Sequence, residues 1–352
     1  MTAGEKPFND NGFVCPRCQK VLHVSNGVEA RCARCDFAMS RRGNVWLLPS
    51  YDPNSYYADV RRQALQYLLR IVPVNGSIRR AMMDRFGRMG QSRVTEYALS
   101  VRRALFMEFI DLPEGAHVLD YGCGFGALGL ATAPIADRVF LADSTLERVT
   151  FAQVHAKELG YNNTIALAGA EWDELPIPQR SLDLVVLNGI LEWIPESRTG
   201  DPAAIQWEFL AAMQHLLKPG GYLMLAIENR YALRYIAGYR DHPGIKFTSL
   251  IPRWLANIYM KQRLGRPYRT LTWPRSTYMK QLPRLGYEAP RFVYLWPDYR
   301  FPHRACWMDD QVAFAALYNQ YPQGREHKMF SILGPTLSRK LVYSFAVISR
   351  AL

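Results

Sequence analysis

Residues 118–131 read Val118-Leu-Asp-Tyr-Gly-Cys-Gly-Phe-Gly-Ala-Leu-Gly-Leu-Ala131 and carry the strongest structural signal in the chain. An apolar run ends at Asp120, and Gly122, Gly124 and Gly126 then alternate ahead of a small-residue segment. Because glycine has no Cβ, such a loop can turn tightly and bring main-chain amides against a ligand at the start of a helix. The dinucleotide fingerprint G-x-G-x-x-G has a different spacing and lacks the acid before the glycines. The stretch predicts a strand, a ligand-binding loop and a helix.

A second apolar run, Arg138-Val-Phe-Leu-Ala-Asp143, also ends in an acid. Asp143 follows Asp120 by twenty-three residues, which leaves room for a helix between two strands of a parallel sheet. A carboxylate at the end of such a strand can accept hydrogen bonds from both ribose hydroxyls of a nucleotide. We therefore expect an α/β fold in which Asp143, with Ser144 beside it, contacts a nucleotide-like cofactor.

The acid followed by three alternate glycines resembles the cofactor loop of class I S-adenosylmethionine-dependent methyltransferases. The resemblance implies a Rossmann-like fold with a seven-stranded sheet, and it covers about residues 105–300. It also implies that the glycines make room for the methionine part of S-adenosylmethionine. Asp120 would hold the ammonium group of the cofactor, directly or through bound water, and Asp143 would hold the ribose.

Later segments follow the same family order. The resemblance implies that Glu171 and Trp172 flank the adenine and that Asp183 opens the fourth strand with a structural role. It places Asn188 where the fourth strand opens onto the cofactor site, and Leu216–Ala226 as the turn and fifth strand. Taken singly, each acid could equally be an ordinary surface carboxylate. Their order along the chain favours a cofactor site.

The final strand has a candidate near the C-terminus. Leu341-Val-Tyr-Ser-Phe-Ala-Val-Ile-Ser349 is an apolar run that would serve as the last strand of the sheet. The resemblance implies that this strand is inserted antiparallel between its two neighbours.

Four of the six cysteines form two pairs near the N-terminus, at Cys15, Cys18, Cys32 and Cys35. The spacing C-x2-C-x13-C-x2-C predicts two knuckles whose thiolates complete a tetrahedral zinc site, with Asn26-Gly27 at the tip of a hairpin between them. Since all four positions are thiolates, the zinc ion would be structural. A pair of disulfides is the alternative, and the lack of a secretion signal disfavours it. Cys123 and Cys306 are expected to be packed free thiols.

We divide the chain into five segments. A zinc ribbon, similar to those that precede some methyltransferase domains, is expected at 1–50, and a helical linker or lid at 51–111. Tyr57 in that lid is a candidate cap over the cofactor, although a purely structural role fits equally well. The core would occupy 112–229, an acceptor-binding insertion with the sixth strand 230–304, and C-terminal helices with the last strand 305–352.

The composition is that of a protein without a membrane span. No apolar stretch approaches the roughly 18 residues that a transmembrane helix needs, and the first residues lack a signal-peptide pattern. We expect a cytoplasmic protein whose contact with a membrane, if any, is peripheral. The oligomeric state cannot be predicted from the sequence.

The positive charge is concentrated after the expected fifth strand. From Asn229 to Arg304 there are fifteen Lys or Arg residues and three acids, a balance of +12 that equals the net charge of the whole chain. The same segment is rich in Tyr and Trp. A basic, aromatic segment favours an anionic acceptor such as a phosphorylated sugar, a glycan, a lipid head group or RNA. The alternative is a solvated cationic face over core aromatics.

This segment also carries a subfamily resemblance. Residues 228–242, Glu228-Asn-Arg-Tyr-Ala-Leu-Arg-Tyr-Ile-Ala-Gly-Tyr-Arg-Asp-His242, are similar to a motif in methyltransferases of bacterial surface-polysaccharide and glycoconjugate gene sets. Gly265–Thr270 and Pro297–Pro302 match that group as well. The resemblance implies transfer of a methyl group to an oxygen of a glycan or another anionic small molecule.

A hydroxyl acceptor needs a general base within hydrogen-bond reach. His242 is the first candidate. Because residues adjacent in sequence rarely orient one another, Glu228 is a better expected partner for it than Asp241. Glu192, just beyond the fourth strand, and His303 are the alternatives.

Two other functions remain open from the sequence. Some ribosomal-RNA methyltransferases also carry a cysteine-rich N-terminal module, and the net charge would suit a phosphate backbone. Against an RNA substrate, the charge lies after the fifth strand and not in the cysteine-rich segment. A non-catalytic protein with a methyltransferase-like fold is the third reading, and the complete set of cofactor motifs argues against it.

Overall fold

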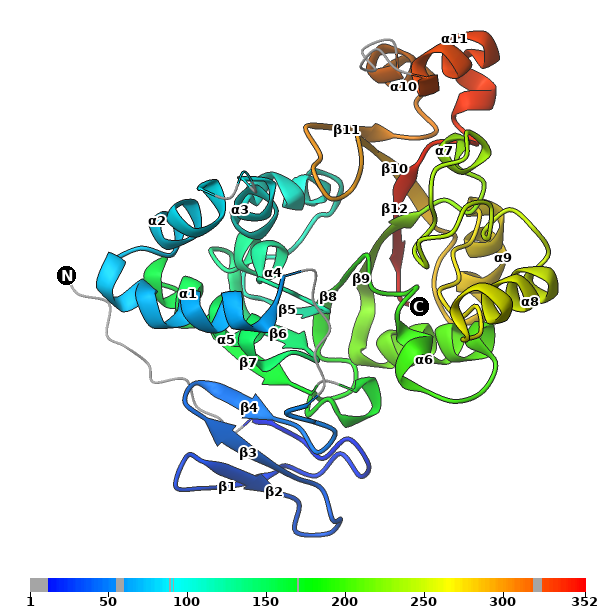
Figure 1. The fold of residues 1–352 in the computed structure, drawn as a ribbon. Helices are drawn as coiled ribbons and strands as arrows, with labels where there is room; N and C mark the ends of the chain where they lie inside the picture. Colours follow the sequence, from blue (N-terminus) through cyan, green and yellow to red (C-terminus); the bar gives the residue numbers. More distant parts are fainter. Residues whose placement is uncertain (1–11, 55–59, 89, 91, 170, 319–324) are drawn as a thin grey trace. The chain divides into compact units, whose positions relative to one another are not determined.

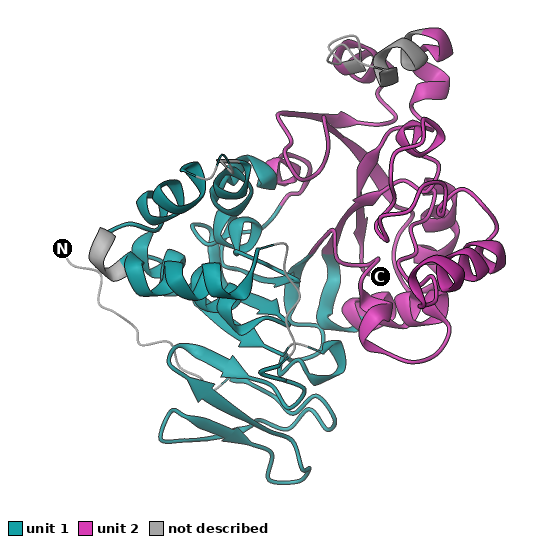
Figure 2. Cartoon of the chain, in the orientation of Figure 1, with its two compact units in different colours: residues 1–104, 112–186, 215–221 teal, residues 105–111, 187–214, 222–352 magenta. Residues whose placement is uncertain are grey.

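A computed structural model describes residues 12–54, 60–88, 90, 92–169, 171–318 and 325–352. The chain divides into two compact units (Figure 2). Unit 1 comprises residues 1–104, 112–186 and 215–221, and unit 2 comprises residues 105–111, 187–214 and 222–352. The strands β8 and β9 each begin in unit 1 and end in unit 2.

The sheet of unit 1 has the strand order β1-β2-β3-β4-β7-β6-β5-β8 (Figure 1). The strand β6 runs parallel to both β5 and β7, and the apolar side chains of the three strands are buried, as expected for parallel strands covered on both faces. The strands of this part are β5 (Ala116–Tyr121), β6 (Ala136–Asp143), β7 (Thr164–Ala168) and β8 (Leu182–Asn188).

The N-terminal strands continue this sheet. They are β1 (His23–Ser25), β2 (Glu29–Arg31), β3 (Ala38–Arg42) and β4 (Val45–Leu47), each antiparallel to the next. Asn26 and Gly27 form the turn between β1 and β2 with φ of 51° and 65°, so the expected hairpin tip is present. β4 then pairs in parallel with β7, so this segment and the central strands share one sheet.

Helices pack on the sheet of unit 1. Leu65, Leu68, Ile78 and Phe86 from the helical segment form a buried cluster with Phe151 of α5. Burial of these side chains stabilises the helical elements that carry them. The helical elements are α1 (Arg62–Asn75), α2 (Ile78–Met82), the π-helix η2 (Met83–Gly87), α3 (Ser92–Leu99), α4 (Ala127–Thr132), α5 (Leu146–Glu158) and the 3-10 turn η4 (Trp172–Glu174).

The segment from α3 to β5 does not form one continuous helix. α3 ends at Leu99, and the chain continues as the 3-10 helix η3 (Val101–Phe109), which is kinked at Ala104. Arg103 donates a hydrogen bond to the Tyr97 carbonyl at 3.0 Å, and its guanidinium lies 3.8 Å above the Tyr97 ring. The helix ends here because a side chain takes a carbonyl that the next turn would otherwise use.

The sheet of unit 2 has the order β9-β12-β10-β11. β12 (Ser344–Arg350) lies antiparallel between β9 (Leu217–Glu228) and β10 (Arg291–Trp296), as expected for the last strand. β11 (Arg304–Trp307), which the sequence analysis did not predict, pairs antiparallel with β10.

The helices of unit 2 come largely from the basic segment and the C-terminus. Ala256 and Met260 of α8 form a buried cluster with Tyr268 and Leu271. None of the helices in the described part of the chain is long and apolar enough to cross a membrane. The helical elements are η5 (Ile194–Ser197), α6 (Pro202–Leu216), α7 (Leu233–Ile236), α8 (Arg253–Leu264), α9 (Arg275–Arg284), α10 (Gln311–Tyr318) and α11 (Arg325–Ser338).

Candidate functional site

The glycine loop after β5 is held against β6. The N–H groups of Gly122 and Cys123 both donate to the Ala142 carbonyl, at 2.8 and 3.0 Å. Gly122, Gly124 and Gly126 have φ of 71°, 57° and 80°, in the left-handed region that favours glycine. All three alternate glycines are therefore required by the backbone conformation.

Two of the loop glycines differ in what surrounds them. A Cβ on Gly126 would lie 2.7 Å from the Cβ of Ala152 in α5, so this glycine permits close packing of loop and helix. A Cβ on Gly124 would meet nothing within 4 Å. The open space beside Gly124 is what a cofactor needs in order to approach the main chain.

Asp120 lies at the base of this loop and is buried. Its Oδ2 accepts a hydrogen bond of 2.8 Å from the N–H of Gly129 in α4. Burial raises the pKa of Asp120 to about 7, although this hydrogen bond and the charge of Arg103 act in the opposite direction. A buried carboxyl with so high a pKa is well suited to binding a cation, because a positive charge beside it favours ionisation.

Asp143 ends β6 with its carboxylate turned toward the glycine loop. Oδ2 accepts a hydrogen bond of 3.0 Å from the Gly124 N–H, and Oδ1 accepts one of 2.9 Å from the Thr145 N–H. Arg148 lies 3.7 Å from Oδ2. A carboxylate oxygen has two acceptor sites, so each oxygen keeps one beyond its main-chain bond, which fits a pair of ribose hydroxyls. Ser144 beside it is exposed.

The predicted adenine residues lie at a short 3-10 turn. Glu171 precedes η4 and Trp172 begins it, and both are half-buried. The Glu171 N–H donates to the Gly169 carbonyl, and a Cβ on Gly169 would lie 2.5 Å from the Cα of Tyr51. The segment after β4 therefore packs directly against this turn. The adenine assignment itself stays a prediction.

Asn188 and Tyr57 are two further predicted cofactor residues. Asn188 ends β8 in unit 2, half-buried, and its Nδ2 is buried without a hydrogen-bond partner. Tyr57 lies outside the residues that the structure describes. Asp183 has the structural role expected of it, because it accepts the His117 N–H at 2.8 Å and pairs with Lys218 at 2.7 Å.

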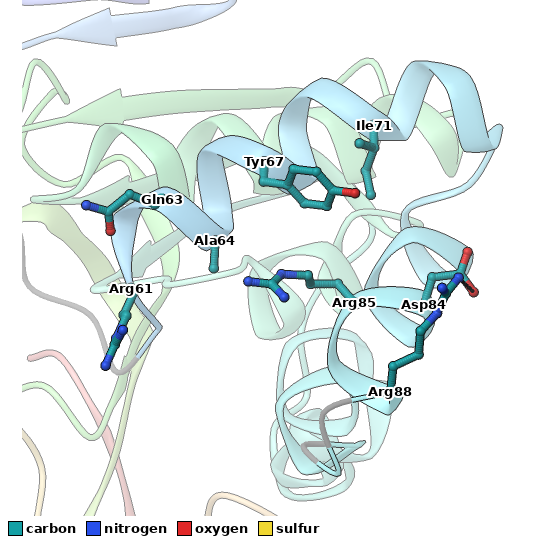
Figure 3. A pocket seen from close by; sticks show the side chains of 8 residues that line it. All are labelled: Arg61, Gln63, Ala64, Tyr67, Ile71, Asp84, Arg85 and Arg88. Carbon is teal, nitrogen blue, oxygen red and sulfur yellow. Dashed lines mark ion pairs between the residues drawn. The ribbon is translucent and has the colours of Figure 1, made fainter.

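A cavity of about 830 Å³ lies in unit 1 between α1 and the segment around η2 (Figure 3). Arg61, Arg85 and Arg88 line it together with Tyr67 and Asp84. Asp84 is paired with Arg88 at 3.8 Å, and Arg85 lies over the Tyr67 ring. The cavity is cationic and belongs to the helical segment that the sequence identifies as a candidate lid.

The four N-terminal cysteines converge. One sulfur from each of Cys15, Cys18, Cys32 and Cys35 lies within 4.8 Å of the other three, and all four are free thiols. Cys18 and Cys32 are 3.6 Å apart at sulfur, close to the about 3.8 Å expected for two thiolates bound to one tetrahedral zinc ion. The Arg34 and Cys35 N–H groups donate to Cys32 Sγ, as in a metal-binding knuckle. The donor set therefore fits zinc. Cys123 and Cys306 are buried and free, as expected.

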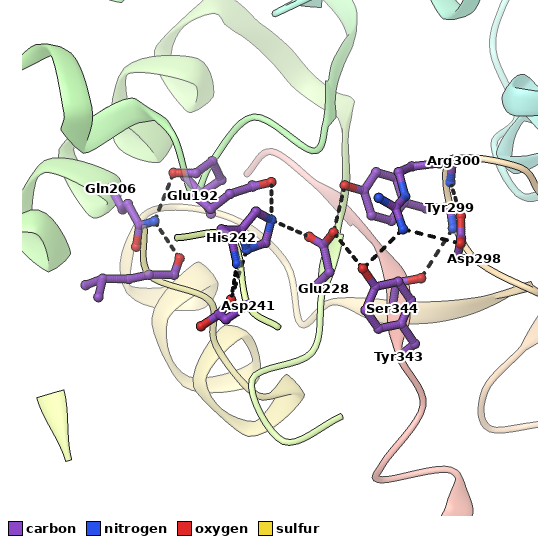
Figure 4. A network of polar contacts seen from close by, with 12 residues as sticks. Glu192, Gln206, Glu228, Asp241, His242, Asp298, Tyr299, Arg300, Tyr343 and Ser344 are labelled. Carbon is purple, nitrogen blue, oxygen red and sulfur yellow. Dashed lines mark hydrogen bonds and ion pairs between the residues drawn. The ribbon is translucent and has the colours of Figure 1, made fainter. Parts of the chain in front are cut away.

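A second group of convergent side chains lies within unit 2 (Figure 4). His242 Nε2 is 3.3 Å from Glu228 Oε2 and 3.4 Å from Glu192 Oε1. The side chains of the two glutamates are 3% and 1% exposed, and that of His242 is 11% exposed. The three predicted catalytic residues are thus brought together, and we call them the His242 cluster.

Glu228 is held at the end of β9 by two tyrosines. Its Oε1 accepts hydrogen bonds from the hydroxyls of Tyr299 at 3.1 Å and Tyr343 at 3.3 Å. Gly189 has φ of 66°, and a Cβ there would lie 2.5 Å from the Tyr299 hydroxyl. The glycine after β8 therefore allows Tyr299 to reach Glu228.

Glu192 is positioned by the main chain before it. The Gln206 side chain donates hydrogen bonds of 2.9 and 2.8 Å to the carbonyls of Leu191 and Leu271, and it accepts one from Trp273. These buried contacts anchor the segment that leads into Glu192.

Asp241 contacts its neighbour, contrary to the expectation that adjacent residues rarely orient one another. Its Oδ1 lies 3.2 Å from His242 Nδ1 and accepts the His242 N–H at 2.7 Å. Its Oδ2 accepts hydrogen bonds from the hydroxyls of Thr248 and Tyr268. The contact forms because the chain turns at Pro243-Gly244, where the Gly244 N–H donates to the Asp241 carbonyl and brings both side chains to the same side.

The charges of the cluster are strongly coupled. Burial opposes the protonated form of His242, but the charge of Glu228 and contacts with Asp241 and Glu192 raise its pKa well above the usual value. Burial also acts to raise the pKa of Glu228, and the neighbouring His242 outweighs this and lowers it. The pKa of Glu192 is raised, chiefly by burial. The protonation states of Glu192, Glu228 and His242 are therefore linked.

The structure gives a different result for His303, the other candidate for the general base. His303 is exposed, its main-chain N–H donates to the Trp296 carbonyl, and no described contact joins it to the His242 cluster. Sequence reasoning missed Tyr299, Tyr343 and Tyr268. Tyr299 could have been noticed, since it lies in the stretch Pro297–Pro302 that the subfamily resemblance singled out.

Part of the basic segment is used within unit 2. Arg269 donates to the carbonyls of Pro195, Arg198 and Gly200, and Arg230 donates to those of Ser249 and Ile251. These guanidinium groups hold loops together. The excess of Lys and Arg in the sequence therefore overstates the number of cationic side chains that are available to a ligand.

Comparisons with known proteins agree with this geometry. Residues 112–241 match a family model described as a methyltransferase domain. The chain is 37% identical over 119 residues to the ubiquinone biosynthesis O-methyltransferase of Xanthomonas axonopodis pv. citri (strain 306), covering 34% of this chain and 45% of that protein. It is 29% identical over 171 residues to the protein of the same name from Serratia proteamaculans (strain 568), covering 44% and 67%.

The coverage of these matches is partial. The chain spans about half the length of the first curated relatives it matches. A solved S-adenosylmethionine-dependent methyltransferase from Mesorhizobium loti has 19% sequence identity and a TM-score of 0.41, covering 71% of this chain and 98% of that chain. The residues that match the methyltransferase-domain model include the glycine loop, Asp143, Glu192 and Glu228, and the match ends one residue before His242.

Proposed function

We propose that this protein is an enzyme that transfers a methyl group from S-adenosylmethionine to an oxygen atom of an anionic small-molecule or glycan acceptor. The observation that carries the donor assignment is the loop between β5 and α4, with Asp120 and Asp143 at its two sides. The open space at Gly124 fits the methionine part of S-adenosylmethionine, and the buried acid Asp120 fits its ammonium group. The remaining acceptor sites on Asp143 fit its ribose.

The sulfonium of bound S-adenosylmethionine makes its methyl group an electrophile. The residues of the chain must then place an acceptor lone pair in line with the carbon–sulfur bond. Formation of the oxygen–carbon bond would be balanced by loss of the carbon–sulfur bond, whose electron pair would stay with the sulfur. The proton of the acceptor hydroxyl must leave to a base or to water.

The His242 cluster is the proposed place where that proton leaves. Glu228 ends β9 and Glu192 follows β8, and ligands of open α/β sheets bind beyond the carboxyl ends of the strands. His242 Nε2, with Asp241 at its other ring nitrogen, would act as a general base only in its neutral form, which its raised pKa disfavours, so the neighbouring carboxylates are the other acceptors for the proton. The names of the curated relatives, which are O-methyltransferases, support oxygen as the acceptor atom.

An anionic acceptor is supported by the cations that unit 2 exposes. Lys261 and Arg263 at the end of α8 are exposed, as are Arg240 and Lys246 in the turn that carries His242. The similarity of residues 228–242 to glycoconjugate methyltransferases favours a glycan or sugar derivative over other anions. The experiment below distinguishes such an acceptor from RNA.

The cysteine cluster is proposed to hold a structural zinc ion. Its four sulfurs have the spacing of a closed tetrahedral site, which leaves no position for substrate. Because β4 is paired with β7, the ion would stabilise the edge of the same sheet that carries the glycine loop.

The proposed function is tested by methyl transfer from isotopically labelled S-adenosylmethionine to a panel of phosphorylated sugars, glycans, hydroxylated small molecules and RNA. Transfer to an oxygen of a non-nucleic-acid acceptor, lost in Asp143→Ala, is the expected result. Transfer to RNA alone, with affinity that falls steeply as salt rises, would replace the proposed acceptor. Binding of S-adenosylmethionine without transfer to any class would instead point to a non-catalytic protein.

A further inference from the structure

We propose that Glu192, Glu228 and His242 form a binding site for a divalent metal ion of the oxygen-preferring class, Mn²⁺ or Mg²⁺. The inference concerns the same cluster as the proposed function and rests on that function only for the role of the ion. The binding site itself rests on the geometry of the cluster.

The spacing of the three donor atoms is the first argument. One donor atom from each side chain lies within 4.8 Å of the other two, and Nε2 of His242 is nearly equidistant from the carboxylates, at 3.3 and 3.4 Å. Ligand atoms about 2.1 Å from a shared ion are about 3.0 Å apart in octahedral and about 3.4 Å apart in tetrahedral coordination. The separations from His242 Nε2 exceed the octahedral value by about 0.3–0.4 Å, which small shifts of the side chains toward a shared ion would close.

The same separations fit a hydrogen-bonded pair less well. Charge-assisted N–H···O bonds are usually about 2.7–2.9 Å long, and one proton on Nε2 cannot point at two carboxylates at once. A proton on His242 Nε2 would draw one glutamate close and leave the other farther away. A shared ion would instead bind both glutamates at similar distances.

Unsatisfied buried oxygens are the second argument. Glu192 Oε2 accepts no hydrogen bond, and Glu228 Oε2 has only the 3.3 Å contact with His242 Nε2, although both side chains are almost completely buried. Buried polar atoms without partners are rare in native proteins, and an ion with its bound waters would satisfy these.

The surroundings of each donor are the third argument. Metal-binding histidines usually contact a carboxylate through the second ring nitrogen, and here Asp241 lies 3.2 Å from His242 Nδ1. Asp241 is itself held by Thr248 and Tyr268, and Glu228 is held through its other oxygen by Tyr299 and Tyr343. These contacts orient the side chains of His242 and Glu228 and leave His242 Nε2 and Glu228 Oε2 available to bind an ion.

The donor set indicates the type of ion. Two carboxylates and one imidazole without thiolate favour Mn²⁺ or Mg²⁺, and three protein ligands leave coordination positions for water or an acceptor oxygen. An ion there would lower the pKa of a bound hydroxyl and release its proton to water. His242 cannot coordinate an ion and accept a proton through Nε2 at the same time, so the ion replaces the histidine as the agent of deprotonation.

Manganese binding to the full chain provides the test. The protein, with its cysteine site intact, is titrated with MnCl₂, and free Mn²⁺ is followed by its six-line EPR signal at room temperature. Mn²⁺ competes poorly with zinc for thiolates, so the cysteine cluster does not interfere. We expect about one bound Mn²⁺ per chain, competed by Mg²⁺, and affinity weakened more than about 100-fold in Glu192→Gln and about 10–100-fold in Asp241→Asn.

The matched control is Glu196→Gln. Glu196 lies four residues from Glu192, pairs with Arg266 at 3.7 Å and is outside the cluster, so this variant should bind Mn²⁺ like the wild type. The Tm without metal reports whether each variant folds. A Mn²⁺-dependent rise in Tm for the wild type but not for Glu192→Gln is expected, since a ligand that binds only the folded state stabilises it.

The outcomes separate this inference from the proposed function. An unchanged EPR signal up to millimolar Mn²⁺ overturns the metal site, as does wild-type affinity in folded Glu192→Gln. If the protein binds Mn²⁺ but methyl transfer proceeds equally fast without any ion, the role of the ion in deprotonation is refuted. If Mn²⁺ binds in the expected manner but no acceptor is methylated, the metal site stands and the proposed function fails.

Discussion

His242 and Asp241 are adjacent in sequence and in contact through their side chains, with 3.2 Å between His242 Nδ1 and Asp241 Oδ1. The turn at Pro243-Gly244 makes this contact, and Thr248 and Tyr268 hold the carboxylate from its other side. Asp241 therefore orients the imidazole ring, whose other nitrogen faces Glu192 and Glu228.

Replacing Asp241 by Asn should lower kcat about 10–100-fold, because the ring would lose the carboxylate that orients it. The affinity for S-adenosylmethionine, measured by calorimetry, should stay unchanged, since the side chain of Asp241 contacts His242, Thr248 and Tyr268, which are not predicted cofactor residues. Glu196→Gln should leave both quantities at wild-type values. An Asp241→Asn protein with normal kcat would show that the contact has no part in turnover.

The affinity for S-adenosylmethionine should rise as the pH increases through about 7. Burial raises the pKa of Asp120 to about 7, so the carboxyl is protonated below that pH and ionised above it. An ammonium group binds the ionised form more strongly. Calorimetry between pH 6 and pH 8 should show this rise in the wild type and not in Asp120→Asn, which also controls for titration of the cofactor itself. Parallel pH profiles for the two proteins would contradict the ammonium assignment.

Ionisation of Asp120 should have the opposite effect on the stability of the protein without cofactor, which should fall as the pH rises. Because the folded-state pKa of Asp120 is above its unfolded value, its contribution is fully present below about pH 4 and is lost as the pH rises through about 7. The free energy of unfolding of the wild type should therefore fall relative to that of Asp120→Asn between pH 4 and pH 7. Denaturant titrations at several pH values provide the measurement, and a constant difference would refute the shifted pKa.

The cysteine cluster should contain about one zinc ion per chain, detectable by elemental analysis. Cys32→Ser should lose the ion and destabilise unit 1, where β4 pairs with β7. A loss of about 3 kcal/mol would lower the Tm by roughly 6–12 °C in a domain of 150–250 residues. Cys306→Ser, which changes a buried thiol of unit 2, should keep the zinc. Native protein without metal would exclude a zinc ribbon.

Gly126→Ala should destabilise the protein more than Gly160→Ala does. The two glycines have φ of 80° and 79°, so both variants carry a backbone cost of about 1–2 kcal/mol. Only the alanine at 126 would also meet Ala152, at 2.7 Å, which adds about 1–3 kcal/mol for overpacking. Equal free energies of unfolding for the two variants would show that the loop does not pack tightly on α5.

The sequence predicts the local features of the site well. Alternate glycines after an apolar run require positive φ wherever the loop is placed, and Asn26-Gly27 forms a hairpin tip for the same local reason. The position of β12 between β9 and β10 was predictable from the family resemblance, because the order of motifs along the chain is enough to identify that fold.

Contacts between distant segments could not be predicted in the same way. Tyr299 and Tyr343 reach Glu228 across 71 and 115 residues, and no local pattern marks a tyrosine as a hydrogen-bond donor to one buried carboxylate. The pairing of β4 with β7 depends on main-chain groups that every residue carries. Likewise, composition alone could not reveal that Arg230 and Arg269 donate to carbonyls and hold loops.

Binding of S-adenosylmethionine to the purified chain, measured by isothermal titration calorimetry, tests the central claim most directly. We predict one site per chain in the wild type and at least a 100-fold loss of affinity in Asp143→Ala, since about two charge-assisted hydrogen bonds of 1.5–3 kcal/mol each would be removed. Asp137→Ala, which removes an exposed acid from the same strand, should bind normally. Absence of binding by the wild type, or equal affinity in folded Asp143→Ala, would contradict the account.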